Sequence, residues 1–182
     1  MIIPETGIPY PGPDFRKSNN RLRDDEYHRI GSSFAAAVAG SVERFDGRDR
    51  SEFKTIVDWG CGAGRVTRYL PSLFPTAYII GVDTDAAAIQ WAEDEIPLID
   101  FHVYEHPPMP VAGGMTDLLV SHVPLIEQVS CMYDFDRVMK HGGLLVLTME
   151  PDAISAWQRG FDLLDVTAGS AENYSTAVLR AR

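Results

Sequence analysis

Cysteine is scarce in this sequence. Its only two cysteines are Cys61 and Cys131, and Cys61 lies in a glycine-rich segment where a disulfide would obstruct the chain. We therefore expect two free thiols. Small scaffolds held together by disulfides are excluded as a class.

Long apolar runs are missing as well. No run approaches the roughly 20 apolar residues that a membrane-spanning helix needs. The first seven residues do not combine a basic segment with a following apolar one, as secretory signals do. We expect a cytoplasmic protein without a membrane partner.

Basic charge is also in deficit, because 16 Lys and Arg face 26 Asp and Glu, for a net charge of −10. The whole excess of acid lies in residues 51–182. A nucleic-acid backbone needs a basic footprint, so we expect no nucleic-acid partner. The one basic cluster comprises Arg16, Lys17, Arg21 and Arg23. We interpret it as a solvated loop before a helix that starts with acidic residues. The alternative is that it contacts an anionic group of a substrate.

The chain length of 182 residues suits one domain with a single core. Residues 1–23 contain repeated prolines and glycines, which predict an extended arm. Apolar residues recur every three or four positions over 24–45, which predicts a helix with one buried face. We divide the chain into an arm and lid helix, residues 1–50, and a main domain, residues 51–182.

From residue 55 onward, short apolar runs alternate with segments of helical length. The expected strands are 55–59, 78–82, 101–104, 117–121 and 144–149. The expected helices are 65–73, 85–95 and 125–139, with Asp85 as an N-cap and 141–143 as a helix stop. This alternation predicts a parallel sheet covered by helices. A short helix at 152–158 and an antiparallel hairpin of 161–166 and 174–181 complete the chain.

Three glycines follow the first expected strand, in the run Asp58-Trp59-Gly60-Cys61-Gly62-Ala63-Gly64. Ligands of open α/β sheets bind beyond the carboxyl ends of strands, and glycines let bare backbone approach them. The spacing G-x-G-x-G differs from the dinucleotide pattern G-x-G-x-x-G. Asp58 would repel a diphosphate but attract an ammonium or sulfonium group. The loop therefore favours a sulfonium nucleoside, and a merely tight turn is the alternative.

Two further strand ends carry acids. Asp83 ends the second expected strand, 19 residues after Gly64, where a carboxylate can accept hydrogen bonds from both ribose hydroxyls. Its alternative is an ordinary cap for the following helix. Glu105, after the third strand, can meet an adenine amino group. Tyr104 is equally compatible with the core, and His106 with a loop.

Together these segments resemble class I S-adenosylmethionine-dependent methyltransferases over residues 55–182. The resemblance rests on TIVDWGCGAGRVTRYL, YIIGVDTD, DFHVYEHPPMP, TDLLVSH and KHGGLLVLTM, in that order. It implies S-adenosylmethionine as cofactor. It also implies a Rossmann-like seven-stranded sheet in the order 3-2-1-4-5-7-6, with strand 7 antiparallel and helices on both faces.

The same resemblance implies a set of site residues. The cofactor site would be lined by Asp58, Gly60, Gly62, Asp83 and Glu105, to which we add Cys61, Gly64, Thr84 and Tyr104, with Ser121 and His122 under the reactive methyl group. The arm PYPGPDFRKSNN and the ending WQRGFDLLDVT loosely resemble a bacterial subgroup associated with glycosyltransferases and saccharide assembly. Thr116 departs from the family, which usually has an aromatic residue there.

A sulfonium methyl group is already activated, so the protein must mainly hold a nucleophile in line with it. A hydroxyl acceptor also needs a base, and His122 is the best-placed candidate; its alternative is a pocket wall. His28 could act within a lid, whereas His102 is read as structural. No set of residues has metal-ligand spacing, so we expect no metal.

We therefore predict methyl transfer to a small-molecule or saccharide acceptor, through oxygen or nitrogen. The rival hypothesis is a non-catalytic domain that binds the cofactor and acts through a partner or in regulation. A nicotinamide oxidoreductase is disfavoured by Asp58 and by the glycine spacing. The arm and first helix are expected to cover the cofactor, so that deleting residues 1–45 would weaken its binding.

Overall fold

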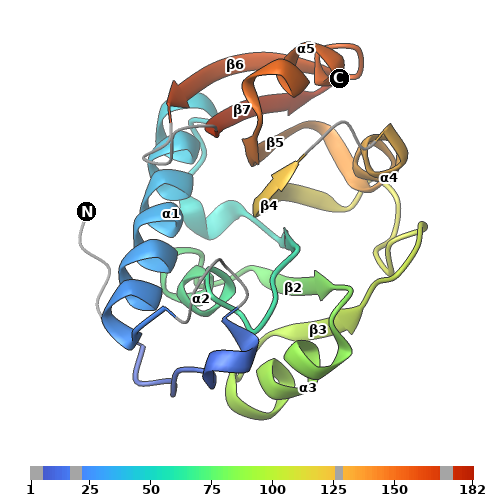
Figure 1. Cartoon of the computed structure of the whole chain (residues 1–182). Coiled ribbons are helices and arrows are strands. Elements are labelled where there is room, and N and C mark those ends of the chain that lie inside the picture. The colour runs from blue at the N-terminus through green and yellow to red at the C-terminus, as the bar shows by residue number, and fades with distance from the viewer. Residues whose placement is uncertain (1–5, 17–21, 126–128, 169–173) are drawn as a thin grey trace.

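The chain folds around a seven-stranded sheet in the order β3-β2-β1-β4-β5-β7-β6, shown in Figure 1. The computed structural model describes residues 6–16, 22–125, 129–168 and 174–182. The strands are β1 (Thr55–Trp59), β2 (Tyr78–Asp83), β3 (Asp100–Val103), β4 (Thr116–Leu125), β5 (Met139–Met149), β6 (Phe161–Ala168) and β7 (Ser175–Ala181). Only β7 runs antiparallel to its neighbours, β5 and β6. The predicted strand order and direction are confirmed.

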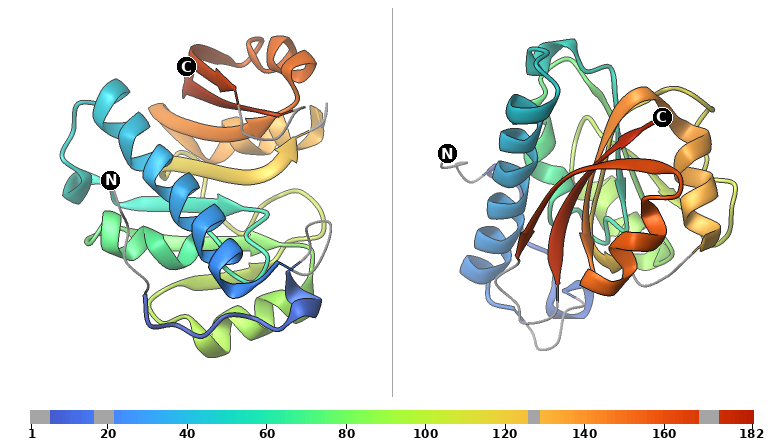
Figure 2. Two further views of the ribbon diagram at one scale, coloured as in Figure 1. Left: turned by 60° about the vertical axis from the view of Figure 1, so that its left-hand side comes forward. Right: turned by 90° about the horizontal axis from the view of Figure 1, so that it is seen from above.

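Helices cover both faces of this sheet. The α-helices are α1 (Asp24–Phe45), α2 (Leu70–Leu73), α3 (Ala86–Glu95), α4 (Val129–Val138) and α5 (Ile154–Trp157). Short 3-10 turns are η1 (Pro13–Phe15), η2 (Arg50–Glu52), η3 (Thr67–Tyr69) and η4 (Pro151–Ala153). Viewed from above, α1 and α4 lie on opposite sides of the sheet (Figure 2). None of the helices in the described ranges is long and apolar enough to span a membrane.

Alternation along β1 divides the core into two layers. Ile56 points to the layer that holds the buried face of α1, whereas Val57 points to the layer of α4 and α5. Within α1, Phe34, Val38 and Val42 are buried in the same apolar cluster as Ile56. Helix α1 is thus a covering layer of the sheet, and its predicted bounds, 24–45, are confirmed.

Three predicted helices were wrong in extent. Strand β4 continues to Leu125, so α4 starts at Val129 instead of 125. The segment 65–73 forms only η3 and the four-residue α2, because Pro71 near the helix start cannot donate a backbone hydrogen bond. The helix predicted over 152–158 is likewise shortened to η4 and α5.

The predicted helix stop at 141–143 was also wrong, because these residues lie inside β5. Met139 already pairs with Thr116, and the register resumes at Leu144 opposite Leu118. The glycines therefore form a bulge in a strand. The β6–β7 hairpin is confirmed, although residues 169–173 of its predicted loop lie outside the described residues.

The arm is anchored to the main domain by Arg68. Its Nη1 lies 3.4 Å from the carbonyl oxygen of Ile8 and 3.1 Å from that of Pro9. The guanidinium carbon also lies 5.4 Å from the ring centroids of Tyr10 and Tyr27. Because this cation is buried, such contacts with ring faces are stronger than at an exposed site. Residues 8–10 are thereby held against Arg68, and the arm runs beside α3 (Figure 2, left).

Replacing Arg68 by Met should free the arm. We expect trypsin to cleave after Arg16 and Arg23 about tenfold faster or more, because local opening of the arm no longer breaks the Arg68 contacts. Timed digestion with mass analysis of the fragments measures this rate. The control is Arg44→Gln, which removes a largely exposed arginine paired with Asp165. First cleavage in the sheet domain, with the arm intact, would contradict the prediction.

Candidate functional site

The carboxyl ends of β1, β2 and β4 meet at a glycine loop, residues 60–64. Gly60 has a φ of 74°, and a Cβ atom on it would lie 2.5 Å from Cγ2 of Val123. Gly64 has a φ of 70°, and its Cβ would lie 2.3 Å from Cδ1 of Ile96. A side chain at either position would be strained and would clash. Glycine is required at these two positions because the backbone has a positive φ there and because the neighbouring side chains leave no room for a Cβ atom.

Asp83 is oriented by the loop. The backbone N–H of Gly62 donates to its Oδ2 at 2.7 Å, and the N–H of Asp85 donates to its Oδ1 at 2.9 Å. The cap of α3 is Asp85, whose side chain accepts from Ala87 and Ala88. The alternative reading of Asp83 as a helix cap is therefore wrong. Each oxygen of Asp83 keeps a lone pair for a further donor.

Two cavities flank the loop. The larger, about 420 Å³, is lined by Trp59, Gly60, Val82, Asp83, Thr84, Tyr104, Glu105, His106, Pro107, Val123 and Cys131. The smaller, about 170 Å³, is lined by Phe15, Arg16, Tyr27, Gly60, Cys61, Gly62, Ala63, Arg65, Asp83, Asp85, Ala88 and Val123. They share Gly60, Asp83 and Val123. The two cavities can thus hold the two halves of one elongated ligand.

The structure brings most of the predicted cofactor residues to these walls. Seven of them line a cavity: Gly60, Cys61, Gly62, Asp83, Thr84, Tyr104 and Glu105. Asp58, Gly64, Ser121 and His122 line neither cavity. Asp58 and Ser121 are buried. The structure therefore leaves these four predicted residues outside both cavities.

Asp58 is buried near the end of β1, where its carboxylate accepts a hydrogen bond from one side chain. Thr67 donates its hydroxyl to Oδ2 of Asp58 at 2.6 Å. Burial raises the pKa of Asp58 to about 7, against the opposing effect of the Thr67 hydrogen bond, and the nearby charge of Asp83 adds to the rise. Without a cationic ligand this carboxylate is therefore costly to ionise.

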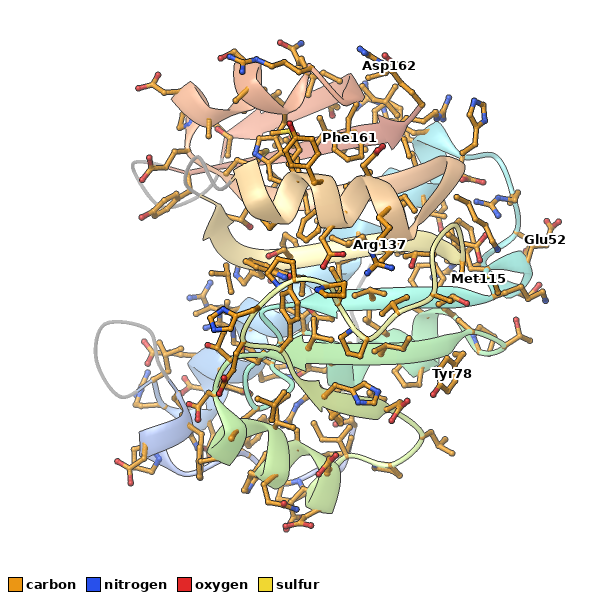
Figure 3. The ribbon with its side chains drawn as sticks, turned by 90° about the vertical axis from the view of Figure 1, so that its right-hand side faces the viewer. Glu52, Tyr78, Met115, Arg137, Phe161 and Asp162 are labelled. Atoms are coloured by element: carbon orange, nitrogen blue, oxygen red, sulfur yellow. The ribbon has the colours of Figure 1, made fainter. Side chains whose placement is uncertain are left out.

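Tyr104 belongs to a buried network as well as to the cavity wall. Its hydroxyl donates to Oδ2 of Asp134 at 3.0 Å, and the N–H of Met109 donates to the same oxygen at 2.6 Å. Arg137, labelled beneath α4 in Figure 3, donates to Oδ1 of Asp134 at 2.7 Å and to the Met109 carbonyl at 3.0 Å. This network fixes the loop after β3 against α4. The Tyr104 ring can face a ligand, while its hydroxyl stays with Asp134.

His122 is half-buried and stacked on Phe34, with ring centroids 4.4 Å apart. Its Nδ1 lies 3.1 Å from Oγ1 of Thr148. Burial, with the charge of Arg65, lowers the pKa of His122 to about 4. The ring is therefore neutral at pH 7, but it is a weak base. Its neighbour Val123 lines both cavities.

The other histidines have separate surroundings. Nδ1 of His28 lies 2.9 Å from the Tyr69 hydroxyl. His102 lies at β3 with Nε2 3.0 Å from Oδ2 of Asp100. His106, read from the sequence as a loop histidine, is an exposed loop residue that also lines the larger cavity. Within the described residues, no group of three or more His, Cys, Asp and Glu is arranged to hold a metal.

Three residues of the site were not predicted from the sequence. Arg65 follows the glycine loop directly and lines the smaller cavity, where burial lowers its pKa. Tyr27 comes from α1 and donates its hydroxyl to the Ala63 carbonyl at 3.2 Å. Val123 forms a wall shared by both cavities. The arginine could have been suspected from its place beside the loop in an acidic chain, but the tyrosine and valine carried no signal.

Comparison with known proteins gives a consistent result. Residues 56–143 match the family described as "Methyltransferase domain". The chain is 33% identical over 109 residues to a trans-aconitate 2-methyltransferase of Afipia carboxidovorans, covering 57% of this chain and 41% of that protein. It is 28% identical over 152 residues to the protein of the same name from Deinococcus radiodurans, covering 81% of this chain and 55% of the relative. The match thus spans about half the length of these relatives or less.

Solved structures share the fold. The structure of a TehB-like SAM-dependent methyltransferase from Corynebacterium glutamicum aligns with a TM-score of 0.63 and 20% identity. The alignment covers 87% of this chain and 97% of that one. At this level of identity, the likeness concerns the arrangement of helices and strands.

The raised pKa of Asp58 predicts a pH-dependent instability. Between about pH 4 and pH 7 the folded state keeps a proton on Asp58 that the unfolded state has lost, so stability falls as pH rises through this window. We expect Asp58→Asn to match the wild type at pH 4.5 and to melt roughly 5 °C higher at pH 8. Thermal melts across this range measure the difference.

His122 contributes the opposite slope between about pH 4 and 6.5. It is present in both proteins, so it cancels in their difference. A wild type that gains stability relative to the variant as pH rises would contradict the buried-acid argument.

Proposed function

We propose that the chain is a class I S-adenosylmethionine-dependent methyltransferase and that it transfers a methyl group from S-adenosylmethionine to a small-molecule acceptor. The observation that carries this proposal is the pair of cavities that share Asp83 and Gly60 at the glycine loop. When bound, the cofactor supplies a methyl group on a positively charged sulfur. The protein's own task is then to bind and orient the two reactants.

The walls fit the cofactor's chemistry. A nucleoside would occupy the larger cavity, where Asp83 can accept from ribose hydroxyls and the loop of Tyr104 and Glu105 offers a ring face and a carboxylate. A zwitterionic amino-acid end would occupy the smaller cavity, which carries Arg16 and Arg65. Asp58, behind the loop, is the candidate partner for its ammonium group. Such a partner would offset the cost of ionising this buried acid.

The same charges disfavour a dinucleotide. Burial is the main cause of the raised pKa of Asp58, and the nearby negative charge of Asp83 adds to the rise. A diphosphate would add two negative charges beside them. Coulomb repulsion at short distance in a partly buried site is large. A nicotinamide cofactor is therefore the less favourable ligand.

For the acceptor, we favour a small carboxylate over a saccharide hydroxyl. A hydroxyl must lose its proton during methyl transfer and gains from a base near neutrality. The pKa of His122, lowered to about 4, makes it poorly suited to that role. A carboxylate is already ionised at neutral pH and needs no base. The relatives are named for transfer to trans-aconitate, a carboxylate, and Arg65 supplies a half-buried cation near His122.

The rival function is cofactor binding without turnover. It is favoured by one observation, that the matched region spans only 41% and 55% of the two relatives' lengths. The glycine loop and Asp83 would be kept in either case. Cofactor affinity with no methylated product, across the acceptors below, would favour this rival.

Cofactor binding should depend on Asp83. We expect Asp83→Ala to weaken binding of S-adenosylhomocysteine about 100-fold or more, because two charge-assisted hydrogen bonds are lost. Isothermal titration calorimetry measures the affinity. The matched control is Asp94→Ala, on the outer side of α3, where Asp94 is exposed and accepts from Gln90. Tighter binding of NAD than of S-adenosylhomocysteine by the wild type would overturn the assignment.

The stability of the methylated product in alkali distinguishes a carboxylate acceptor from a hydroxyl or amine acceptor. With isotope-labelled S-adenosylmethionine and panels of di- and tricarboxylates, sugars and amines, we expect label in the carboxylates. A methyl ester releases the label as methanol in mild alkali, whereas a methyl ether or N-methyl group does not. Mass analysis identifies the product. Label that survives alkali, with sugars as the acceptors, would favour the saccharide alternative.

His122→Asn separates the two acceptor classes independently. With a carboxylate acceptor, we expect less than a tenfold loss of kcat and the same pH dependence of kcat as in the wild type, because His122, whose pKa is lowered to about 4, would not be the base. A base acting on a hydroxyl would instead be worth about 10²- to 10⁴-fold. A loss of that size would contradict the carboxylate proposal.

A further inference from the structure

A further cavity lies near the amino ends of the parallel strands, at the opposite end of these strands from the glycine loop. A cavity of about 380 Å³ is lined by Asp46, Arg48, Asp117, Lys140, His141, Gly142, Gly143 and Arg180. These residues come from the segment after α1, the starts of β4 and β5, and the end of β7. In Figure 3 this end of the strands is the one marked by Glu52, Met115 and Tyr78. The cavity is thus separate from the two at the loop.

The acids in this cavity are already satisfied. Asp117 accepts from the backbone N–H groups of Lys54 and Thr55 at 2.9 and 3.1 Å, from Arg48 at 3.1 Å and from Lys140 at 2.9 Å. Asp46 accepts from Nη2 of Arg48 at 2.8 Å. The two carboxylates therefore hold the cations in place. Because this pairing neutralises the two carboxylates and two cations alike, Arg180 is the cation in the lining that no described carboxylate of the cavity offsets.

The cations retain donors. Lys140 carries three N–H bonds, and its contacts in this cluster are the two oxygens of Asp117. Nη2 of Arg180 donates to the Phe45 carbonyl, while its Nε is buried and has no hydrogen-bond partner within the described residues. A buried, unpartnered donor on a guanidinium is costly.

The bulge in β5 adds backbone groups to the same wall. Residues 140–143 lie between Met139 and Leu144 and take no part in the pairing of β5 with β4 or β7. Gly142 has a φ of 79°, and a Cβ on Gly143 would lie 2.7 Å from Cε of Met139. Successive N–H groups in a turn with one left-handed residue form the kind of concavity that binds anions.

We propose that this cavity binds the phosphate group of a small molecule, as free phosphate or as a phosphate monoester. Three cations, two of them fixed by the same buried acid, face two acids in a chain whose net charge is −10. This local excess of positive charge is opposite in sign to the net charge of the whole molecule. The volume is within the usual range for small-molecule sites. This site is independent of methyl transfer.

The test follows the bulge amides by nuclear magnetic resonance. Inorganic phosphate and glycerol phosphate are titrated into the ¹⁵N-labelled wild-type protein, with sodium chloride at equal ionic strength as reference. We expect saturable shifts of the Gly142 and Gly143 amide signals with either phosphate and not with chloride. The compound that binds more tightly distinguishes a monoester from free phosphate. Shifts that do not saturate, or that chloride reproduces, overturn the proposal.

Two variants of one residue supply the matched control. Lys140→Gln should weaken phosphate binding about tenfold or more, because one charge-assisted contact is lost, whereas Lys140→Arg should keep it. Asp117 retains three donors in either variant, so the fold should persist. Equal affinity in both variants would also overturn the proposal. The wild-type titration stands even if a variant fails to fold.

Discussion

The hydrogen bond from the Gly62 N–H to Asp83 is the contact on which the site depends. It ties the turn after β1 to the end of β2, so that a bare backbone loop and an oriented carboxylate face the same space. The loop can approach so closely only because Val123 and Ile96 fill the room that side chains on Gly60 and Gly64 would need. Crowding and hydrogen bonding together give the two cavities their shared wall.

Two buried aspartates show how the same side chain serves opposite ends of the sheet. Burial alone would raise the pKa of Asp117, but hydrogen bonds from Lys140, two backbone N–H groups and Arg48 outweigh it and lower that pKa. Asp58 is buried with the Thr67 hydroxyl as its side-chain donor, and its pKa rises to about 7. Asp117 therefore stabilises the fold as an anion, whereas Asp58 favours its protonated form up to about pH 7.

Sequence patterns predicted the framework well where periodicity is strong. The apolar spacing of 24–45 and the buried run 55–59 coincide with α1 and β1, because these elements bury regular faces. The bulge at 141–143 was mistaken for a helix stop, since glycines mark a turn without saying which element contains it. The places of Tyr27 and Val123 in the cavity walls depend on contacts between distant segments, which no local pattern records.

Arg68 joins two parts of the molecule that are far apart in sequence. Its Nε donates to the Gly64 carbonyl of the loop, and its Nη1 lies against the carbonyls of Ile8 and Pro9 in the arm. By thermodynamic reciprocity, a ligand that binds the loop more tightly when the arm is docked must also strengthen arm docking by the same factor. The fraction of molecules with an open arm then falls as such a ligand occupies the loop.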